Sequence, residues 1–142
     1  MTDKLKIAVF KMTGCAGCQM ELLRLEDELL DIVGKVDVVY FMMAQNRDEL
    51  ERYDLCFVEG SVSTPRELEE IKVIRSRTKT LIALGDCAIT GCIPSIKNWI
   101  PQSDVERRVY KDTLPLRSFK TSGIWEYVPV DLMLPGCPPH KN

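Results

Sequence analysis

This chain of 142 residues has no excess of basic residues. Its 19 lysines and arginines face 21 aspartates and glutamates, and the formal net charge is -2. The two signs are interleaved along the sequence, so they form no cationic stripe. Because proteins that bind a phosphate backbone carry such a stripe, we expect no nucleic-acid partner.

A long apolar run is also absent. The stretch from Val36 to Met43 is interrupted by Asp37, whereas a helix that crosses a bilayer needs about 20 apolar residues. Residues 1–6 carry neither an apolar export signal nor a twin-arginine pair. We therefore expect no direct membrane insertion and a cytoplasmic location.

Cysteine, by contrast, occurs six times at uneven spacing. In a reducing compartment such cysteines favour metal or redox chemistry over a disulfide framework. A chain of 142 residues with 45% hydrophobic content is long enough for one core and too short for two ordinary domains. The sequence predicts a single domain over residues 1–142.

Short apolar segments alternate with helical patterns along the chain. The predicted strands lie at residues 6–10, 36–41, 55–58, 80–84 and 127–134. One helix is predicted between the first two strands, from an apolar face made of Leu22, Leu25, Leu29, Ile32 and Val33. A second begins at Pro65, because Thr64 can cap it and Glu67 completes a capping box. This alternation predicts an α/β fold, a mostly parallel sheet with helices on both faces.

Four of the cysteines follow predicted strands. Cys15 and Cys18 form a Cys-x-x-Cys loop after the first strand, Cys87 follows the fourth, and Cys137 follows the last. Because parallel strands end at the same edge of a sheet, we expect these thiols to meet there. Residues 93–123, rich in proline, serine and charge, predict a long connection that could hold one short helix.

Thiolates at one edge suit an iron-sulfur cluster or zinc. Structural zinc usually takes two close cysteine pairs, which favours iron-sulfur here. Gly14, Gly17, Gly85 and Gly136 stand beside the cysteines and would let backbone N–H groups approach cluster sulfurs. A dithiol oxidoreductase stays open, because strand, Cys-x-x-Cys and helix is also its arrangement. So does simple burial of Cys87 and Cys137.

The chain resembles the small subunits of nickel-iron hydrogenases, and four motifs in order carry the resemblance. They are Thr13-Gly14-Cys15-Ala16-Gly17-Cys18-Gln19-Met20, Val58-Glu59-Gly60-Ser61-Val62, Gly85-Asp86-Cys87-Ala88-Ile89-Thr90-Gly91 and Leu134-Pro135-Gly136-Cys137-Pro138-Pro139. The similarity is greatest to the short subunits of cytoplasmic, bidirectional, NAD(P)-linked hydrogenases. These share a flavodoxin-like fold with the small cluster-bearing subunit of respiratory complex I. In complex I relatives the first motif has adjacent cysteines, whereas here Ala16 and Gly17 separate them.

The resemblance implies one 4Fe-4S cluster, ligated by Cys15, Cys18, Cys87 and Cys137 and lying nearest the nickel-iron centre of a partner large subunit. Electrons would pass on to subunits with further iron-sulfur clusters, flavin and NAD(P). Glu59 matches an acid near the subunit interface and could take part in a hydrogen-bond network or a proton route there; a solvated acid at a strand end is the alternative. The cysteine-rich extension of longer relatives is lacking, and the stop at Asn142 suggests a short or truncated chain.

Two cysteines have no predicted ligand role. Cys56 lies mid-strand and is expected to be buried, while Cys92, five residues after Cys87, is expected to point elsewhere. A flavin could bind in the complex, although no phosphate-binding loop follows the first strand. The alternative functions are a subunit of a complex I-like quinone oxidoreductase or membrane hydrogenase, a lone dithiol oxidoreductase and a zinc-stabilised interaction module. The sequence does not name the final electron acceptor.

Overall fold

The computed structural model describes residues 4–25, 27–44 and 52–140. A parallel sheet with strand order β2-β1-β3-β4-β5 forms its centre. The strands are β1 (Leu5–Lys11), β2 (Val36–Phe41), β3 (Tyr53–Glu59), β4 (Thr78–Leu84) and β5 (Leu132–Leu134). This order is that of the flavodoxin-like doubly wound folds, so the predicted fold class is confirmed.

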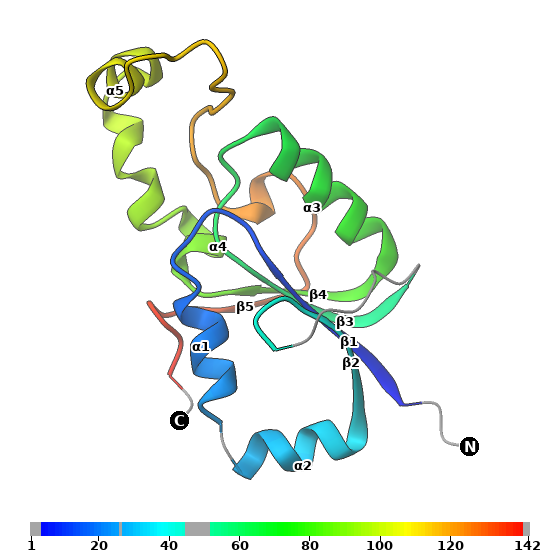
Figure 1. Cartoon of the computed structure of the whole chain (residues 1–142). Helices are drawn as coiled ribbons and strands as arrows, with labels where there is room; N and C mark the ends of the chain where they lie inside the picture. Colours follow the sequence, from blue (N-terminus) through cyan, green and yellow to red (C-terminus); the bar gives the residue numbers. More distant parts are fainter. Residues whose placement is uncertain (1–3, 26, 45–51, 141–142) are drawn as a thin grey trace.

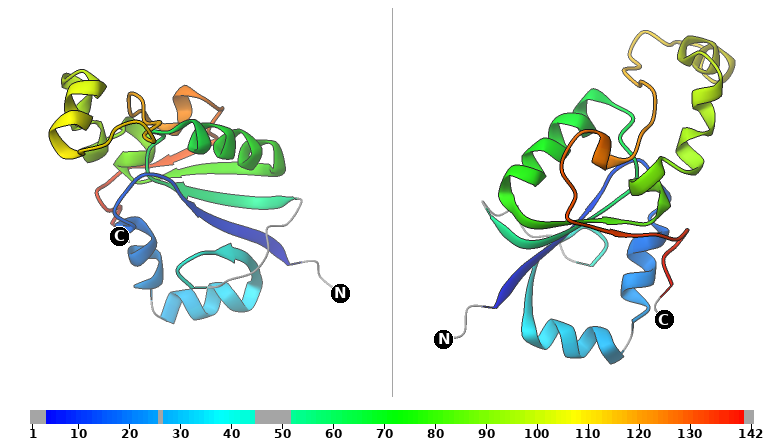
Figure 2. Two further views of the ribbon diagram at one scale, coloured as in Figure 1. Left: turned by 45° about the horizontal axis from the view of Figure 1, so that its top comes forward. Right: turned by 180° about the vertical axis from the view of Figure 1, so that it is seen from behind.

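Helical segments cover both faces of the sheet (Figures 1 and 2). On one face lie α1 (Gly17–Leu23) and α2 (Asp27–Lys35), and on the other α3 (Pro65–Arg77), α4 (Asp86–Thr90) and the short 3-10 helix η2 (Ile124–Glu126). The 3-10 helix η1 (Ile93–Trp99) and α5 (Gln102–Val109) extend away from the sheet. None of the helices in the described ranges combines the length and the apolar character required to cross a bilayer.

The three central strands supply most of the core. Ala8 and Phe10 of β1, Val58 of β3 and Leu81 of β4 are at most 1% exposed. Phe10 stacks on Tyr40 of β2 with ring centroids 4.3 Å apart. Such buried strands place their carboxyl ends at fixed positions along one edge of the sheet.

The start of α3 agrees with the sequence. The Thr64 hydroxyl accepts the Glu67 N–H at 3.3 Å, the Glu67 carboxylate reaches back to the Thr64 N–H at 3.1 Å, and Pro65 occupies the first turn. The predicted capping box is therefore confirmed. Further along, Ile71 and Ile74 pack into the core.

Two predicted elements differ from the structure. The single helix expected after the Cys-x-x-Cys loop is two helices, and Ile32 and Val33 of α2 are exposed at 42% and 45% instead of facing the core. The last strand, expected from residue 127, is only β5. Tyr127 closes the η2 turn and Pro129 lacks the N–H that a sheet ladder needs, so pairing starts later.

The connection before β5 is longer and more helical than predicted. Residues 93–123 contain η1 and α5 in place of at most one short helix. Trp99 of η1 is 90% exposed and Trp125 of η2 is 53% exposed, so neither is a core residue. Because β5 arrives after this long excursion, its position depends on tertiary contacts.

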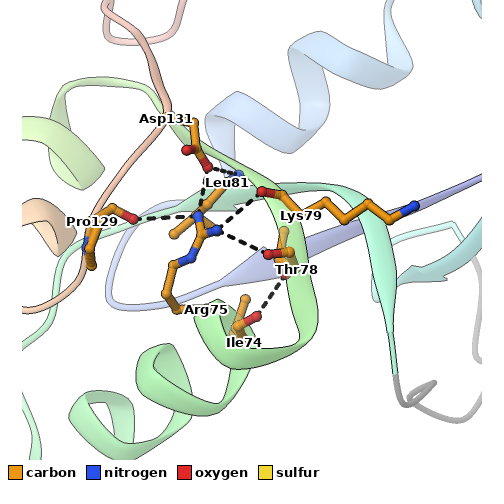
Figure 3. A network of polar contacts seen from close by, with 7 residues as sticks. All are labelled: Ile74, Arg75, Thr78, Lys79, Leu81, Pro129 and Asp131. Carbon is orange, nitrogen blue, oxygen red and sulfur yellow. Dashed lines mark hydrogen bonds and ion pairs between the residues drawn. The ribbon is translucent and has the colours of Figure 1, made fainter.

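An arginine at the end of α3 supplies several of these contacts (Figure 3). The Arg75 guanidinium donates to the carbonyls of Thr78 and Lys79 at 3.0 and 3.1 Å, and to the Asp131 carboxylate at 2.6 Å. Asp131 also accepts the Leu81 N–H at 2.7 Å, while its own N–H donates to the Leu81 carbonyl at 3.0 Å. The Arg75–Asp131 clamp thus joins α3, β4 and the start of β5.

Candidate metal centre

The four predicted ligands meet at the carboxyl edge of the sheet. Cys15 and Cys18 follow β1, Cys87 follows β4 and Cys137 follows β5, and all four line one cavity of about 100 Å³. Glu59, at the end of β3, lines the same cavity. The convergence expected from strand topology is therefore present.

The Cys-x-x-Cys loop is shaped by its backbone. Ala16 adopts a left-handed conformation with φ 67°, which turns the chain into α1. The Gly17 N–H then donates to the Cys15 sulfur at 3.4 Å. Weak N–H donation to a thiolate sulfur is the kind of contact that stabilises iron-sulfur ligands and tunes their potential.

A buried carboxylate caps α1 in place of a local side chain. Glu59 is 2% exposed and accepts the N–H groups of Cys18 and Gln19 at 3.1 and 3.3 Å. The amide of Gln19, itself fully buried, donates to the second Glu59 oxygen at 2.9 Å. Glu59 is thus no solvated acid at a strand end, and that alternative is wrong.

Two glycines make room for the site. A Cβ on Gly85, whose φ is +84°, would lie 2.4 Å from the Cys18 sulfur. A Cβ on Gly60, with φ +86°, would lie 2.8 Å from the Met12 carbonyl carbon. Only glycine fits either position without strain. The Cys18 thiol therefore occupies a cradle that any larger residue at position 85 would fill.

The loops after β4 and β5 are joined to each other. The Asp86 carboxylate accepts the Gly136 N–H at 2.8 Å, and the Asp86 N–H donates to the Gly136 carbonyl at 2.9 Å. The Gly85 N–H donates to the Leu134 carbonyl at 2.8 Å. These bonds hold Cys87 and Cys137, each adjacent in sequence to one partner, against the same cavity.

The thiols are close enough to influence one another. Burial, together with the Glu59 charge and the neighbouring thiols, raises the pKa of Cys18 to about 12. Burial and the thiols of Cys92, Cys137 and Cys15 raise the pKa of Cys87 to about 11. Metal-free thiols of this kind stay protonated at neutral pH, so metal binding must release their protons.

Cys92 differs from the expectation that it points elsewhere. Its thiol lies near enough to raise the pKa of both Cys87 and Cys137, although Cys92 does not line the cavity. The reason is local: Gly91 has φ +85° and Cys92 has φ 41°, so the chain reverses immediately after α4. Cys56, by contrast, is fully buried within β3, as predicted.

The donor set fits a cluster on two observations: four thiols surround one cavity, and a Cβ at Gly85 would fill the space of Cys18. Within residues 4–25, 27–44 and 52–140, no group of three or more His, Cys, Asp or Glu side chains is arranged to hold a single metal ion, so the four thiols would have to share a larger group such as a cluster.

Gln19 and Asp86 stand within the sequence motifs, but the sequence predicts no role for either. Both contact residues of the site: the Gln19 amide donates to the Glu59 carboxylate, and the Asp86 carboxylate accepts the Gly136 N–H. The signal was their position beside a ligand in the Cys18-Gln19 and Asp86-Cys87 pairs. Neither pair indicates by itself which partner the side chain will find.

Subunits of known hydrogenases are similar in sequence to this chain. Sulfhydrogenase 2 subunit delta of Pyrococcus furiosus is 40% identical over 140 residues, covering 97% of this chain and 58% of its own length. The NAD-reducing hydrogenase HoxS subunit delta of Cupriavidus necator is 28% identical over 152 residues, with 96% and 73% covered. The chain therefore spans little more than half of the Pyrococcus relative.

A solved structure matches closely in shape. A chain in the crystal structure of an NAD+-reducing NiFe-hydrogenase in the H2-reduced state superimposes with a TM-score of 0.88 at 26% identity, over 96% of this chain and 84% of that chain. The family model described as NADH ubiquinone oxidoreductase, 20 Kd subunit, matches residues 15–142, which include all four cavity cysteines. This chain belongs to the NADH ubiquinone oxidoreductase 20 Kd subunit family.

Proposed function

We propose that this chain is the electron-transfer small subunit of a nickel-iron hydrogenase. It would hold one 4Fe-4S cluster through Cys15, Cys18, Cys87 and Cys137. The observation that carries the proposal is the convergence of these four thiols, from three separate loops, on one cavity. The names of the relatives, which are hydrogenase subunits from two different organisms, support the same assignment.

Within the proposed subunit the chain's own residues hold the site in place. The bound cluster would supply one-electron transfer between the hydrogen-activating metals and an NAD(P)-linked module. Glu59 fixes the N-terminus of α1 and with it the Cys18 backbone. Its carboxylate lies at the cavity wall, so we also propose it as a proton or hydrogen-bond relay at the subunit interface.

The hydrogen-activating metals would lie in a partner large subunit. A nickel-iron site requires two Cys-x-x-Cys pairs, and this chain has one, which is committed to the cluster. Directly after Cys92, η1 exposes Ile93, Ile96 and Trp99 at 65%, 62% and 90%. These exposed apolar side chains support a protein partner that packs on this segment. Subunits with further iron-sulfur clusters and flavin would complete the complex.

The direct test is anaerobic purification of the chain, alone and co-expressed with a large subunit that carries two Cys-x-x-Cys pairs. We expect brown protein with iron and acid-labile sulfide in equal amounts, about four of each per chain. Hydrogen turnover should require the large subunit. Hydrogen exchange at residues 14–18, 59–62 and 85–91 should slow when the complex forms.

Other outcomes would identify the alternatives. Zinc without iron would indicate a structural module, and a colourless chain with disulfide reductase activity would indicate a dithiol enzyme. Quinone reduction without hydrogen turnover would favour the complex I-like function that the family description names. Hydrogen turnover by the isolated chain would contradict the proposed division of roles.

A further inference from the structure

The Glu67 carboxylate makes more contacts than a capping box requires. One oxygen, Oε2, accepts the N–H groups of Ser63 and Thr64 at 2.9 and 3.1 Å and their hydroxyls at 3.1 and 3.0 Å. The other, Oε1, accepts the Thr13 hydroxyl at 2.6 Å. Because Thr13 belongs to the loop after β1, this last bond links α3 to a different part of the fold.

Thr13 is held from several directions. Its N–H donates to the Ser61 carbonyl at 3.0 Å, and the Ser61 N–H donates back at 2.8 Å. Its hydroxyl also lies 2.6 Å from the Ser63 hydroxyl. Thr13, Ser63 and Glu67 make three contacts with one another, but their two hydroxyl groups supply only two hydrogens. The Glu67 carboxylate, which can only accept, therefore fixes the orientation of both hydroxyl groups.

The loop cannot shift by itself, because it packs backbone against backbone. A Cβ on Gly14 would lie 3.3 Å from the Gly60 Cα, and one on Gly60 would lie 2.9 Å from the Thr13 carbonyl oxygen. Movement of Thr13 would therefore displace Gly60 and its neighbour Glu59. Cys15, two residues after Thr13, and Glu59, which caps the backbone at Cys18, would move with it.

We propose that Glu67 is a positioning residue for the cluster site and acts through the Thr13 hydroxyl. In addition to capping α3, its charge fixes the loop that presents Cys15 and supports Glu59. The inference rests on the proposed function, because it concerns how tightly the site holds its iron. It assigns a role at the cluster to an acid that does not itself line the cavity.

The test compares variants that separate the tether from the cap in the anaerobically reconstituted full chain. Thr13→Val removes the hydroxyl and leaves the capping box intact, whereas Thr64→Ala weakens the cap and leaves the Thr13 bond intact. Glu67→Gln keeps a residue suited to a capping box but removes the charge. Measured are iron release to EDTA, the paramagnetic spectrum of the reduced cluster and the melting temperature.

We expect Thr13→Val and Glu67→Gln to release iron about tenfold faster and to change the spectrum, because a charge-assisted hydrogen bond is lost. The Thr13→Val/Glu67→Gln double variant should release iron no faster than the faster of the two single variants, since both changes remove the same interaction. Thr13→Ser, which retains the hydroxyl, should stay within about twofold of the wild-type rate. Thr64→Ala should lower the melting temperature and leave iron release and the spectrum unchanged.

A Thr13→Val variant that releases iron at the wild-type rate and shows the wild-type spectrum would overturn the inference. So would Thr64→Ala that accelerates release as much as Glu67→Gln, because Glu67 would then act as a cap alone. Neither result affects the proposed function, which depends on iron in the wild-type chain. Wild-type protein that binds no iron would overturn the proposed function and this inference with it.

Discussion

The two ends of the central strands are built differently. At the amino ends, charged side chains join neighbouring elements: Arg75 pairs with Asp131 at 2.6 Å, and Lys79 with Asp54 at 2.5 Å. At the carboxyl ends, cysteines and left-handed glycines surround a cavity, and backbone N–H groups supply most of the bonds. One edge holds the strands together, whereas the other leaves space for a cofactor.

This difference predicts that stability and cofactor binding can be separated by mutation. Changes at the carboxyl edge should remove the cluster before they unfold the chain. Changes at the amino edge or in the core should lower stability before they affect the cluster. Both edges share β4, so the contrast can be measured within one strand and its flanking residues.

The largest effect is expected at a proposed ligand. Cys87→Ser should abolish or strongly deplete the cluster, because a hydroxyl replaces a thiolate ligand, while the melting temperature of the metal-free protein stays close to wild type. The matched control is Cys56→Ser, which buries a hydroxyl in β3 and should cost about 1–3 kcal/mol of stability. Iron analysis and thermal unfolding would check both. Full cluster content in Cys87→Ser would contradict the ligand assignment.

A glycine at the same edge should have the next largest effect. Gly85→Ala places a methyl group 2.4 Å from the Cys18 sulfur at φ +84°, which should cost about 1–3 kcal/mol in backbone strain and deplete the cluster. Gly34→Ala in α2 is the control, since no atom lies within 4 Å of its Cβ position. That change should be neutral or stabilise the chain by up to about 1 kcal/mol. Equal cluster loss in Gly85→Ala and Gly34→Ala would contradict the claim that the space at Gly85 accommodates the Cys18 thiol.

At the amino edge, Asp131→Asn should lower stability by about 1 kcal/mol and leave the cluster intact; the estimate is modest because the Asp131 side chain is 45% exposed and screened by solvent. The Leu81 N–H and Arg75 hold the pKa of Asp131 below its usual range. A carboxyl group whose pKa is lowered by folding stabilises the fold at pH values above its ordinary pKa of about 4. This stabilisation is lost as the pH falls through the lowered pKa.

Chemical unfolding of wild type and Asp131→Asn at several pH values would measure this dependence. The difference between the two proteins should be largest near neutral pH and shrink below about pH 4. Lys72→Ala, which breaks an exposed pair with Glu69 within α3, is the control and should cost at most about 0.5 kcal/mol. A stability difference that grows as the pH falls would contradict the predicted pH dependence.

Cys92→Ser should have the smallest effect on the site. The four proposed ligands remain, so cluster content should match wild type. The Cys92 thiol raises the pKa of Cys87 and Cys137, and a hydroxyl in its place changes the polarity beside them, so the reduced cluster should show a small shift in midpoint potential. Loss of the cluster in this variant would show that Cys92 is a ligand.

Strong local signals explain which elements could be predicted. The strand at 36–41 and the start of α3 at Pro65 follow from apolar patterns and capping residues, and the structure matches both. Parallel topology then brings Cys15, Cys18, Cys87 and Cys137 to one edge without knowledge of any side-chain contact. The break between α1 and α2 and the short β5 were missed, because apolar periodicity alone does not indicate where a helix or strand ends.

The sequence by itself determined the fold class and the four cysteines at the sheet edge, because strand patterns, spacing and glycines are local properties. Only the tertiary structure decided that Glu59 is buried under α1, that Glu67 reaches Thr13 and that Cys92 turns back toward Cys87. These contacts join residues from different elements or depend on a left-handed turn. A sequence pattern does not contain the geometry that brings such partners within a hydrogen bond of each other.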